Sequence, residues 1–181
     1  SESLSASAQN GFNLFMGKAA CGTCHFAPNF NGMVPPFYDD TESEVLGITT
    51  NADSNNLQLD DDLGRYANGK RAEKSAHFKH SIKTPTIRNI ELTGPYFHNG
   101  GFESLEDVMW FYNNGGGAGL GLDVPNQTLP PDPLDLTESE IEDIIHFLKS
   151  LTDVSEFQDT PSSLPDFADD PSLKNRKPNN Y

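Results

Sequence analysis

The segment AACGTCHFAP, residues 19–28, holds both cysteines of the chain and a histidine directly after the second one. The two thiols of such a C-x-x-C-H motif can add across the two vinyl groups of a porphyrin, because the spacing places both sulfurs on one side of a helical turn. The imidazole that follows then lies under the iron and supplies an axial nitrogen. Cys21, Cys24 and His25 therefore predict one covalently attached haem c, with His25 as the proximal ligand.

Two other uses of paired cysteines fit the sequence less well. A redox-active disulfide sits at the start of a helix within an alternating strand–helix pattern, and no strand is predicted here. A zinc site needs two further ligands at a recognisable spacing, and we interpret His77 and His80, three positions apart, as exposed loop histidines. Because haem is attached covalently outside the bacterial cytoplasm or in an organelle, the motif favours a periplasmic or otherwise exported protein.

The second axial position of the iron decides what such a haem does. A protein ligand there makes the haem an electron carrier, whereas an open position can bind peroxide or oxygen. A thioether ligand raises the reduction potential and a phenolate lowers it. The candidates are Met16, Met33, Met109, Tyr112 and the remaining histidines. Because Met109 and Tyr112 share one face of a predicted helix, where core packing is the ordinary role of either residue, the spacing alone leaves the choice open.

The elements that must position this chemistry are short amphipathic helices. Helices are predicted at residues 7–18, 104–113 and 137–151, with a helical turn at residues 60–67. Ser104 can cap the second helix, and Thr137 and Glu140 form a capping box at the start of the third. Gly11 on the first helix and Phe147 on the last predict that these two helices cross closely, because a small residue lets its neighbour approach.

Between the helices the chain is rich in Gly, Pro, Asn and Asp. Loops are expected at residues 29–59, 83–101 and 115–133, and no strand is predicted. The predicted fold is therefore all-α, a class I cytochrome c-like domain in which short helices and long loops surround a haem. This domain is expected to cover residues 7–153, between a polar lead-in at residues 1–6 and a surface tail at residues 154–181.

The overall composition limits the class of partner. The 181 residues carry a formal net charge of −15, and an acidic surface repels the phosphates of nucleic acid. Partners that are basic or small suit this charge better. The longest apolar runs are too short to span a bilayer, so no transmembrane segment is expected.

Three further stretches, together with the C-x-x-C-H motif, resemble a known family. They are DDDLGRYANG, IKTPTIRNIELTGPYFHNGGFESLEDVMWFYNNG and LTESEIEDIIHFLKSLT. In this order they resemble the carboxy-terminal haem domain of bacterial di-haem cytochrome c peroxidases, a superfamily that includes the MauG-like enzymes. The resemblance covers roughly residues 11–153, which is nearly all of the predicted folded part.

The resemblance implies a role for each residue of the haem site. Cys21 and Cys24 match the thioether cysteines of the family, and His25 matches its proximal ligand. The peroxidase branch places a distal methionine in the helix after the PYFHNG-like motif, and the MauG-like branch places a tyrosine there. The matching position here is Tyr112, so Tyr112 is the preferred sixth ligand and Met109 the alternative. A His/Tyr haem is a poorer acceptor of electrons than a His/Met haem.

The family also implies contacts around the haem. A calcium ion lies between the two haem domains of the family, and backbone carbonyls at the positions of Thr93 and Pro95 would contribute to it. Arg65 and Arg88 match family arginines and are expected to contact the haem propionates. His98 either serves the same edge of the haem or fixes its loop through a hydrogen bond.

The family enzymes have two C-x-x-C-H motifs in one chain, and this sequence has one. We expect a fragment of a longer protein, whose amino-terminal domain would carry the haem that reduces hydrogen peroxide. This chain would then be the electron-transfer domain, reduced by a small electron-donor protein. A stand-alone single-haem c-type cytochrome is the alternative, and a domain with an open, weakly peroxidatic iron site is a third possibility.

Overall fold

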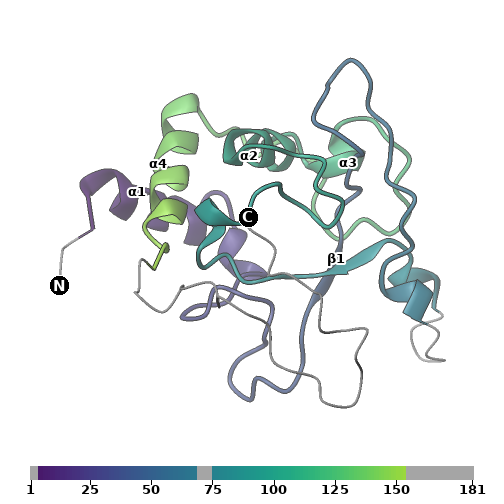
Figure 1. Cartoon of the computed structure of the whole chain (residues 1–181), viewed down its shortest axis with the longest axis horizontal. Helices are drawn as coiled ribbons and strands as arrows, with labels where there is room; N and C mark the ends of the chain where they lie inside the picture. Colours follow the sequence, from purple (N-terminus) through teal and green to yellow (C-terminus); the bar gives the residue numbers. More distant parts are fainter. Residues whose placement is uncertain (1–3, 69–74, 154–181) are drawn as a thin grey trace, which may run out of the picture.

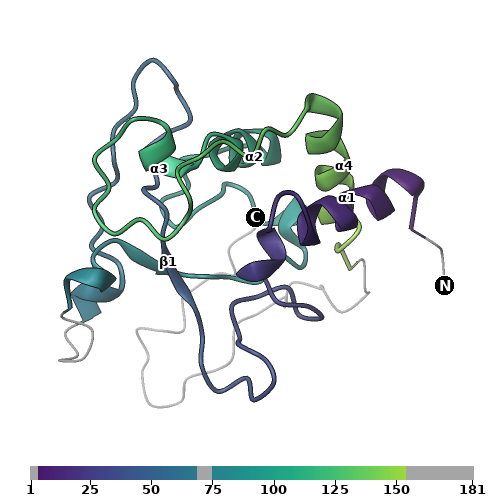
Figure 2. The same cartoon turned by 180° about the vertical axis from the view of Figure 1, so that it is seen from behind.

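The computed structural model describes residues 4–68 and 75–153. The expected tail at residues 154–181 and the first half of the expected lead-in, residues 1–3, lie outside the described residues. The regular elements are α1 (Ala6–Met16), β1 (Ser43–Val45), β2 (Ser81–Lys83), α2 (Leu105–Asn113), α3 (Gly116–Gly119) and α4 (Glu138–Lys149). Helices α1 and α4 lie side by side at one end, α2 lies beside them, and α3 lies at the far end (Figures 1 and 2).

The crossing of α1 and α4 confirms the prediction made from Gly11 and Phe147. A Cβ at position 11 would collide with the backbone carbonyl of Asp143 and with the side chain of Phe147, so only glycine permits this approach. The rings of Phe12 and Phe15 pack on Phe147 with centroid distances of 5.4 and 5.2 Å. The first helix thus joins the last through one interlocked aromatic contact.

Local capping fixes where two of the predicted helices begin. Thr137 and Glu140 form the expected capping box on α4, with the Thr137 amide donating to Glu140 Oε2 at 2.8 Å. Ser104 caps α2, and its hydroxyl accepts from the amide of Asp107 at 3.0 Å. Both helices start within one residue of the predicted position because the capping side chain is part of the sequence pattern itself.

The expectation that the chain has no strand is wrong. Strands β1 and β2 form a two-stranded antiparallel sheet in which Ser43 pairs with Lys83 and Val45 with Ser81. Each strand has only three residues, too few for an alternating pattern to be visible. The expected loop at residues 115–133 likewise contains the short helix α3, and the turn expected at residues 60–67 is a 3₁₀ helix at Arg65–Asn68. The fold is therefore helix-rich with one small sheet.

Two apolar clusters flank α2. The first, which we call the crossing core, surrounds the contact between α1 and α4 and includes the buried Met109. The second, the aromatic cluster, contains Phe97, Phe102, Phe111 and Tyr112. Because residues 109 and 111 lie on opposite sides of a helix, α2 contributes to both clusters and connects them.

Candidate haem-attachment site

The C-x-x-C-H motif forms one tight turn directly after α1. Residue Ala20 takes a left-handed conformation, with φ of 53°, and reverses the chain into a 3₁₀ helix at Cys21–Thr23. The amides of Cys24 and His25 both donate to the carbonyl of Cys21, at 3.2 and 3.0 Å. These bonds close the turn, so both sulfurs and the imidazole are held within it, as the motif predicts.

Both cysteines are free thiols and half-buried. Burial raises the pKa of Cys21 to about 12. Burial also raises the pKa of Cys24, and the carboxylate of Glu44 raises it further. Reactive redox cysteines have lowered pKa values instead, so this environment does not suit a thiolate that exchanges disulfides.

The surroundings of His25 favour a neutral imidazole that can bind a metal through Nε2. Its Nδ1 lies 3.4 Å from the carbonyl oxygen of Phe30. Burial lowers the pKa of His25, and hydrogen bonds to the carbonyls of Phe30 and Pro85 only partly oppose this. With the proton on Nδ1 donated to a carbonyl, the lone pair of Nε2 is available to a metal.

Tyr112 approaches the thiols from another part of the chain. Burial raises the pKa of its phenol, and negative charge on Cys21 and Cys24, when these thiols are ionised, and on Glu44 raises it further. This influence places Tyr112 within electrostatic reach of both attachment cysteines. Its ring lies 5.6 Å from Phe111 and 6.0 Å from Phe97, and its hydroxyl makes no hydrogen bond within the described part of the chain.

The three methionines have different surroundings. Met109 is 3% exposed and belongs to the crossing core. Met16 is 44% exposed on α1 and lies against Gly22 of the C-x-x-C-H turn. Met33 is half-buried in the long loop after the motif. Met109 therefore has the packing role that any buried methionine can fill, whereas Tyr112 is set apart by its relation to the thiols.

The two arginines lie on different segments, and Arg88 contacts a residue close to the motif. Arg65 donates from Nη1 to the hydroxyl of Ser43 at 3.0 Å and lies 4.8 Å from the ring centre of Phe78. The exposed Arg88 donates to the carbonyl of Pro28, three residues after His25, at 3.4 Å. Contact of either guanidinium with a haem propionate stays a prediction.

The remaining predicted residues lie further along the chain. The Nε2 atom of His98 lies 3.2 Å from Oδ1 of Asp60, which is the loop-fixing contact expected of it, and its place at the haem edge stays a prediction. Thr93 and Pro95 are exposed and follow the 3₁₀ helix at Ile90–Leu92, and their calcium role stays a prediction. His77 is exposed as expected, whereas His80 is half-buried.

Sequence reasoning missed a pair of carboxylates beside the motif. The thiol of Cys24 and the side chains of Glu42 and Glu44 bring their ligand atoms within 4.8 Å of one another. Burial raises the pKa of Glu42, and the neighbouring Glu44 raises it further. No spacing rule connects residues 42 and 44 with residue 24, so no pattern in the sequence could have revealed this contact.

The donor set fits a covalently attached haem. Two protonated, half-buried thiols lie on one turn, and a neutral imidazole follows them with Nε2 available. The phenol of Tyr112, on α2, lies within electrostatic reach of the same thiols. A haem held here would take its thioether bonds from the two thiols and an axial nitrogen from His25, and Tyr112 would be a candidate for the second axial ligand.

Comparisons with known proteins agree with this chemistry. No protein-family model matches the chain. The cytochrome-c peroxidase IdrP1 of Denitromonas iodatirespirans is 34% identical over 163 residues, which cover 82% of this chain and 41% of the relative. The methylamine utilization protein MauG of Methylorubrum extorquens is 32% identical over 149 residues, which cover 82% of this chain and 35% of the relative. The chain thus spans less than half the length of these curated relatives.

Solved structures share the fold. A MauG-like protein associated with microbial copper homeostasis superposes with a TM-score of 0.66 at 23% identity, over 83% of this chain and 48% of that one. The diheme peroxidase BthA of Burkholderia thailandensis superposes with a TM-score of 0.54 at 21% identity, over 84% of this chain and 44% of that one. Within residues 4–68 and 75–153, no helix is both long and apolar enough to cross a bilayer. Over the part that it shares with these relatives, the chain belongs to the family of di-haem cytochrome c peroxidases and MauG-like proteins.

Proposed function

We propose that this chain is the electron-transfer haem domain, in the carboxy-terminal position, of a di-haem cytochrome c peroxidase-like oxidoreductase. Cys21 and Cys24 would hold one haem c by thioether bonds. When bound, the haem supplies one-electron transfer, from an external donor to a second haem at which hydrogen peroxide takes up two electrons and two protons to give two waters. The residues of this chain set the potential and the orientation of the carrier.

His25 supplies the proximal nitrogen in this proposal. The Nδ1–H group of His25 donates a hydrogen bond to the carbonyl oxygen of Phe30, and this bond fixes the tautomer and the ring plane. Burial keeps the imidazole neutral, so no proton competes with the metal for Nε2. The ring also lies 6.4 Å from that of Phe15, which packs one side of it with apolar surface.

In this proposal Tyr112 would be the sixth ligand, and one observation supports the assignment. The phenol lies within electrostatic reach of both attachment cysteines, although it comes from α2 and not from the segment of the motif. The rings of Phe97 and Phe111 lie against the Tyr112 ring and limit its orientations. Its hydroxyl makes no hydrogen bond within the described part of the chain. A phenolate ligand stabilises the oxidised iron and lowers the potential.

Glu42 and Glu44 act in the same direction as the phenolate. Both carboxylates lie next to the sulfur of Cys24. Negative charge close to a redox centre favours its more positive, oxidised state. The site is therefore built to hold the carrier at a low potential.

The surroundings of the domain follow from the same proposal. Thr93 and Pro95 would give backbone carbonyls to a calcium ion at the boundary with the amino-terminal haem domain, since both are exposed. A net charge of −15 favours a small donor protein with a basic docking surface. Covalent haem attachment would favour a location in the periplasm or otherwise outside the cytoplasm.

Replacement of Tyr112 by phenylalanine tests the ligand assignment. We expect Tyr112→Phe to lose the six-coordinate low-spin absorption and electron paramagnetic resonance features of the haem-loaded protein and to raise its midpoint potential. The matched control is Tyr96→Phe, which removes the half-buried hydroxyl that donates to the Ile90 carbonyl at 3.2 Å. Met109→Leu tests the alternative. A low-spin spectrum that survives in Tyr112→Phe and disappears in Met109→Leu would transfer the ligand role to the methionine.

The relay role needs a second experiment on the longest protein that the gene encodes. A second C-x-x-C-H motif upstream of this chain, and peroxide-dependent oxidation of a reduced donor cytochrome that His25→Ala abolishes, are the expected results. A gene product with only this one motif, which exchanges electrons but does not consume peroxide, would establish the stand-alone cytochrome instead.

A further inference from the structure

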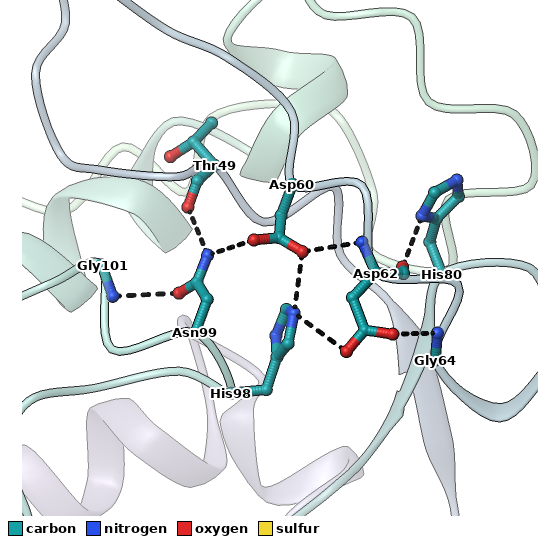
Figure 3. A network of polar contacts seen from close by, with 8 residues as sticks. All are labelled: Thr49, Asp60, Asp62, Gly64, His80, His98, Asn99 and Gly101. Carbon is teal, nitrogen blue, oxygen red and sulfur yellow. Dashed lines mark hydrogen bonds and ion pairs between the residues drawn. The ribbon is translucent and has the colours of Figure 1, made fainter. Parts of the chain in front are cut away.

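A polar network joins the segment at residues 49–64 to the loop at residues 96–102 (Figure 3). Asp60 lies at its centre. Its Oδ2 accepts from Asn99 Nδ2 at 2.9 Å, and its Oδ1 accepts from the amide of Asp62 at 2.9 Å and from His98 Nε2 at 3.2 Å. Three donors thus converge on one carboxylate, whose side chain is only 17% exposed.

The carboxylate is ionised and cannot be exchanged for an amide without loss. Burial opposes the charge of Asp60, but the hydrogen bonds from Asn99, Asp62 and His98 outweigh it and lower the pKa below its ordinary value of 3.8. An ionised carboxylate is an acceptor only, which matches three donors. The amide NH₂ group of an asparagine at position 60 would face one or more of these three donors, and a hydrogen bond would be lost.

Asn99 extends the network into the loop before α2. Its Nδ2 also donates to the carbonyl of Thr49 at 3.0 Å, and its Oδ1 accepts from the amide of Gly101 at 3.0 Å. A Cβ at position 101 would lie 2.5 Å from the carbonyl oxygen of Thr50, so the two loops touch backbone to backbone. The conformation of the loop at residues 96–102 is therefore stabilised by contacts with another segment, at residues 49–60.

Phe97 and Phe102 of this loop both pack on α2, and Phe97 is the one whose ring also lies near Tyr112. The Phe97 φ of 62° lies in the left-handed region, which a bulky side chain adopts only where the surroundings enforce it. The ring packs edge-on against Phe111 at 5.1 Å and lies 6.0 Å from Tyr112. The neighbouring His98 and Asn99 are the two side chains that bind Asp60, so the network enforces the conformation in which Phe97 meets the tyrosine.

We propose that Asp60 is a positioning residue for the Tyr112 ligand, acting through Asn99 and Phe97. This inference rests on the proposed role of Tyr112. Asp60 holds the loop whose aromatic side chain limits the orientations of the phenol, and so biases the site toward the ligated state.

The test compares haem-loaded Asp60→Asn with Asp61→Asn. Both variants remove one negative charge from adjacent positions, but Asp61 is exposed and outside the network. Loss of a charge-assisted hydrogen bond shifts an equilibrium by about tenfold or more. We therefore expect the ratio of six-coordinate to five-coordinate haem to fall by about tenfold in Asp60→Asn only, with a rise in midpoint potential. Deuterium uptake of the peptide at residues 96–104 should increase in the same variant.

Asn99→Ala keeps the test decisive if Asp60→Asn does not fold. It removes one donor and the contact to Thr49 but leaves the carboxylate with two partners, and we expect the same changes in the same direction. The inference is overturned if both folded variants, or Asn99→Ala alone, keep the coordination ratio and midpoint potential of Asp61→Asn.

Tyr112→Phe separates this failure from failure of the proposed function. A changed spectrum in Tyr112→Phe together with unchanged spectra in Asp60→Asn and Asn99→Ala removes the positioning role and leaves the ligand assignment intact. An unchanged spectrum in Tyr112→Phe removes the ligand assignment, and the positioning role falls with it.

Discussion

The two sides of the haem site are built in different ways. On the attachment side, Cys21, Cys24 and His25 occupy one turn, and the crossing of α1 and α4 supports that turn with buried apolar side chains. On the proposed ligand side, Tyr112 lies on α2 in an aromatic cluster, and a polar network between two distant loops holds the loop that carries Phe97.

This difference bears on how each side tolerates change. Apolar packing is spread over many weak contacts, so the attachment side loses stability before it loses geometry. A buried polar network depends on each of its few members, because an unpaired donor or acceptor is costly. We therefore expect perturbations of the attachment side to change stability and perturbations of the ligand side to change coordination.

Removal of the proximal ligand should have the largest effect. His25→Ala leaves both thiols in place, so haem should remain covalently bound while the normal Soret and low-spin features are lost. Denaturing gel haem staining and absorption spectroscopy measure the two properties. His77→Ala, at an exposed histidine, is the control and should resemble the wild type. A normal spectrum in His25→Ala would contradict the assignment.

A methyl group added at Gly11 or at Gly101, where two backbone segments approach closely, should affect stability on the attachment side and coordination on the ligand side. Gly11→Ala forces α1 away from the backbone of α4, and overpacking of this kind costs about 1–3 kcal/mol in the free energy of unfolding. Gly101→Ala pushes the loop before α2 away from Thr50 and should change the ratio of six- to five-coordinate haem.

Denaturant unfolding and absorption spectra of both glycine variants test this contrast. Asn10→Ala, at an exposed position of α1, is the control for stability. Our comparison fails if Gly11→Ala alters coordination in the folded protein, or if Gly101→Ala lowers stability without altering it.

Removal of the capping side chain should lower the free energy of unfolding by a similar amount on α2 and on α4. Thr137→Ala on α4 and Ser104→Ala on α2 each remove a side-chain acceptor from a helix N-terminus, at a typical cost of about 1 kcal/mol. Thr137→Ser retains the hydroxyl and should retain most of the stability. Denaturant midpoints measure the loss, and a cost several times larger on either helix would show that the cap has a further role.

The smallest expected effect is the pH dependence from Asp60. Its pKa is lowered in the folded state, so it adds stability in full above its ordinary value of 3.8. This contribution falls as the pH drops through 3.8 and is lost below the folded pKa. The difference in unfolding free energy between the wild type and Asp60→Asn should therefore be constant near neutral pH and shrink below about pH 4. A difference that grew with acidification would contradict the assigned sign.

Local sequence patterns predicted a large part of the fold. Helices α2 and α4 begin where Ser104 and Thr137 cap them, as the sequence predicted. Gly11 predicted the crossing of α1 and α4. Each of these signals lies within a few residues of the structure that it predicts. The predicted helix at residues 7–18 overran α1, which ends at Met16 before Gly17. The β1–β2 sheet was missed because its pairing connects segments far apart in the chain.

The sequence by itself determined that the two thiols and the imidazole lie on one turn, because they are close together in the chain and their spacing alone fixes this arrangement. Only the tertiary structure decided which side chain approaches those thiols from α2, that two glutamates lie beside Cys24, and that Asp60 binds Asn99. The physical reason is distance along the chain. Contacts between remote segments arise from the packing of the whole domain, and no local spacing encodes them.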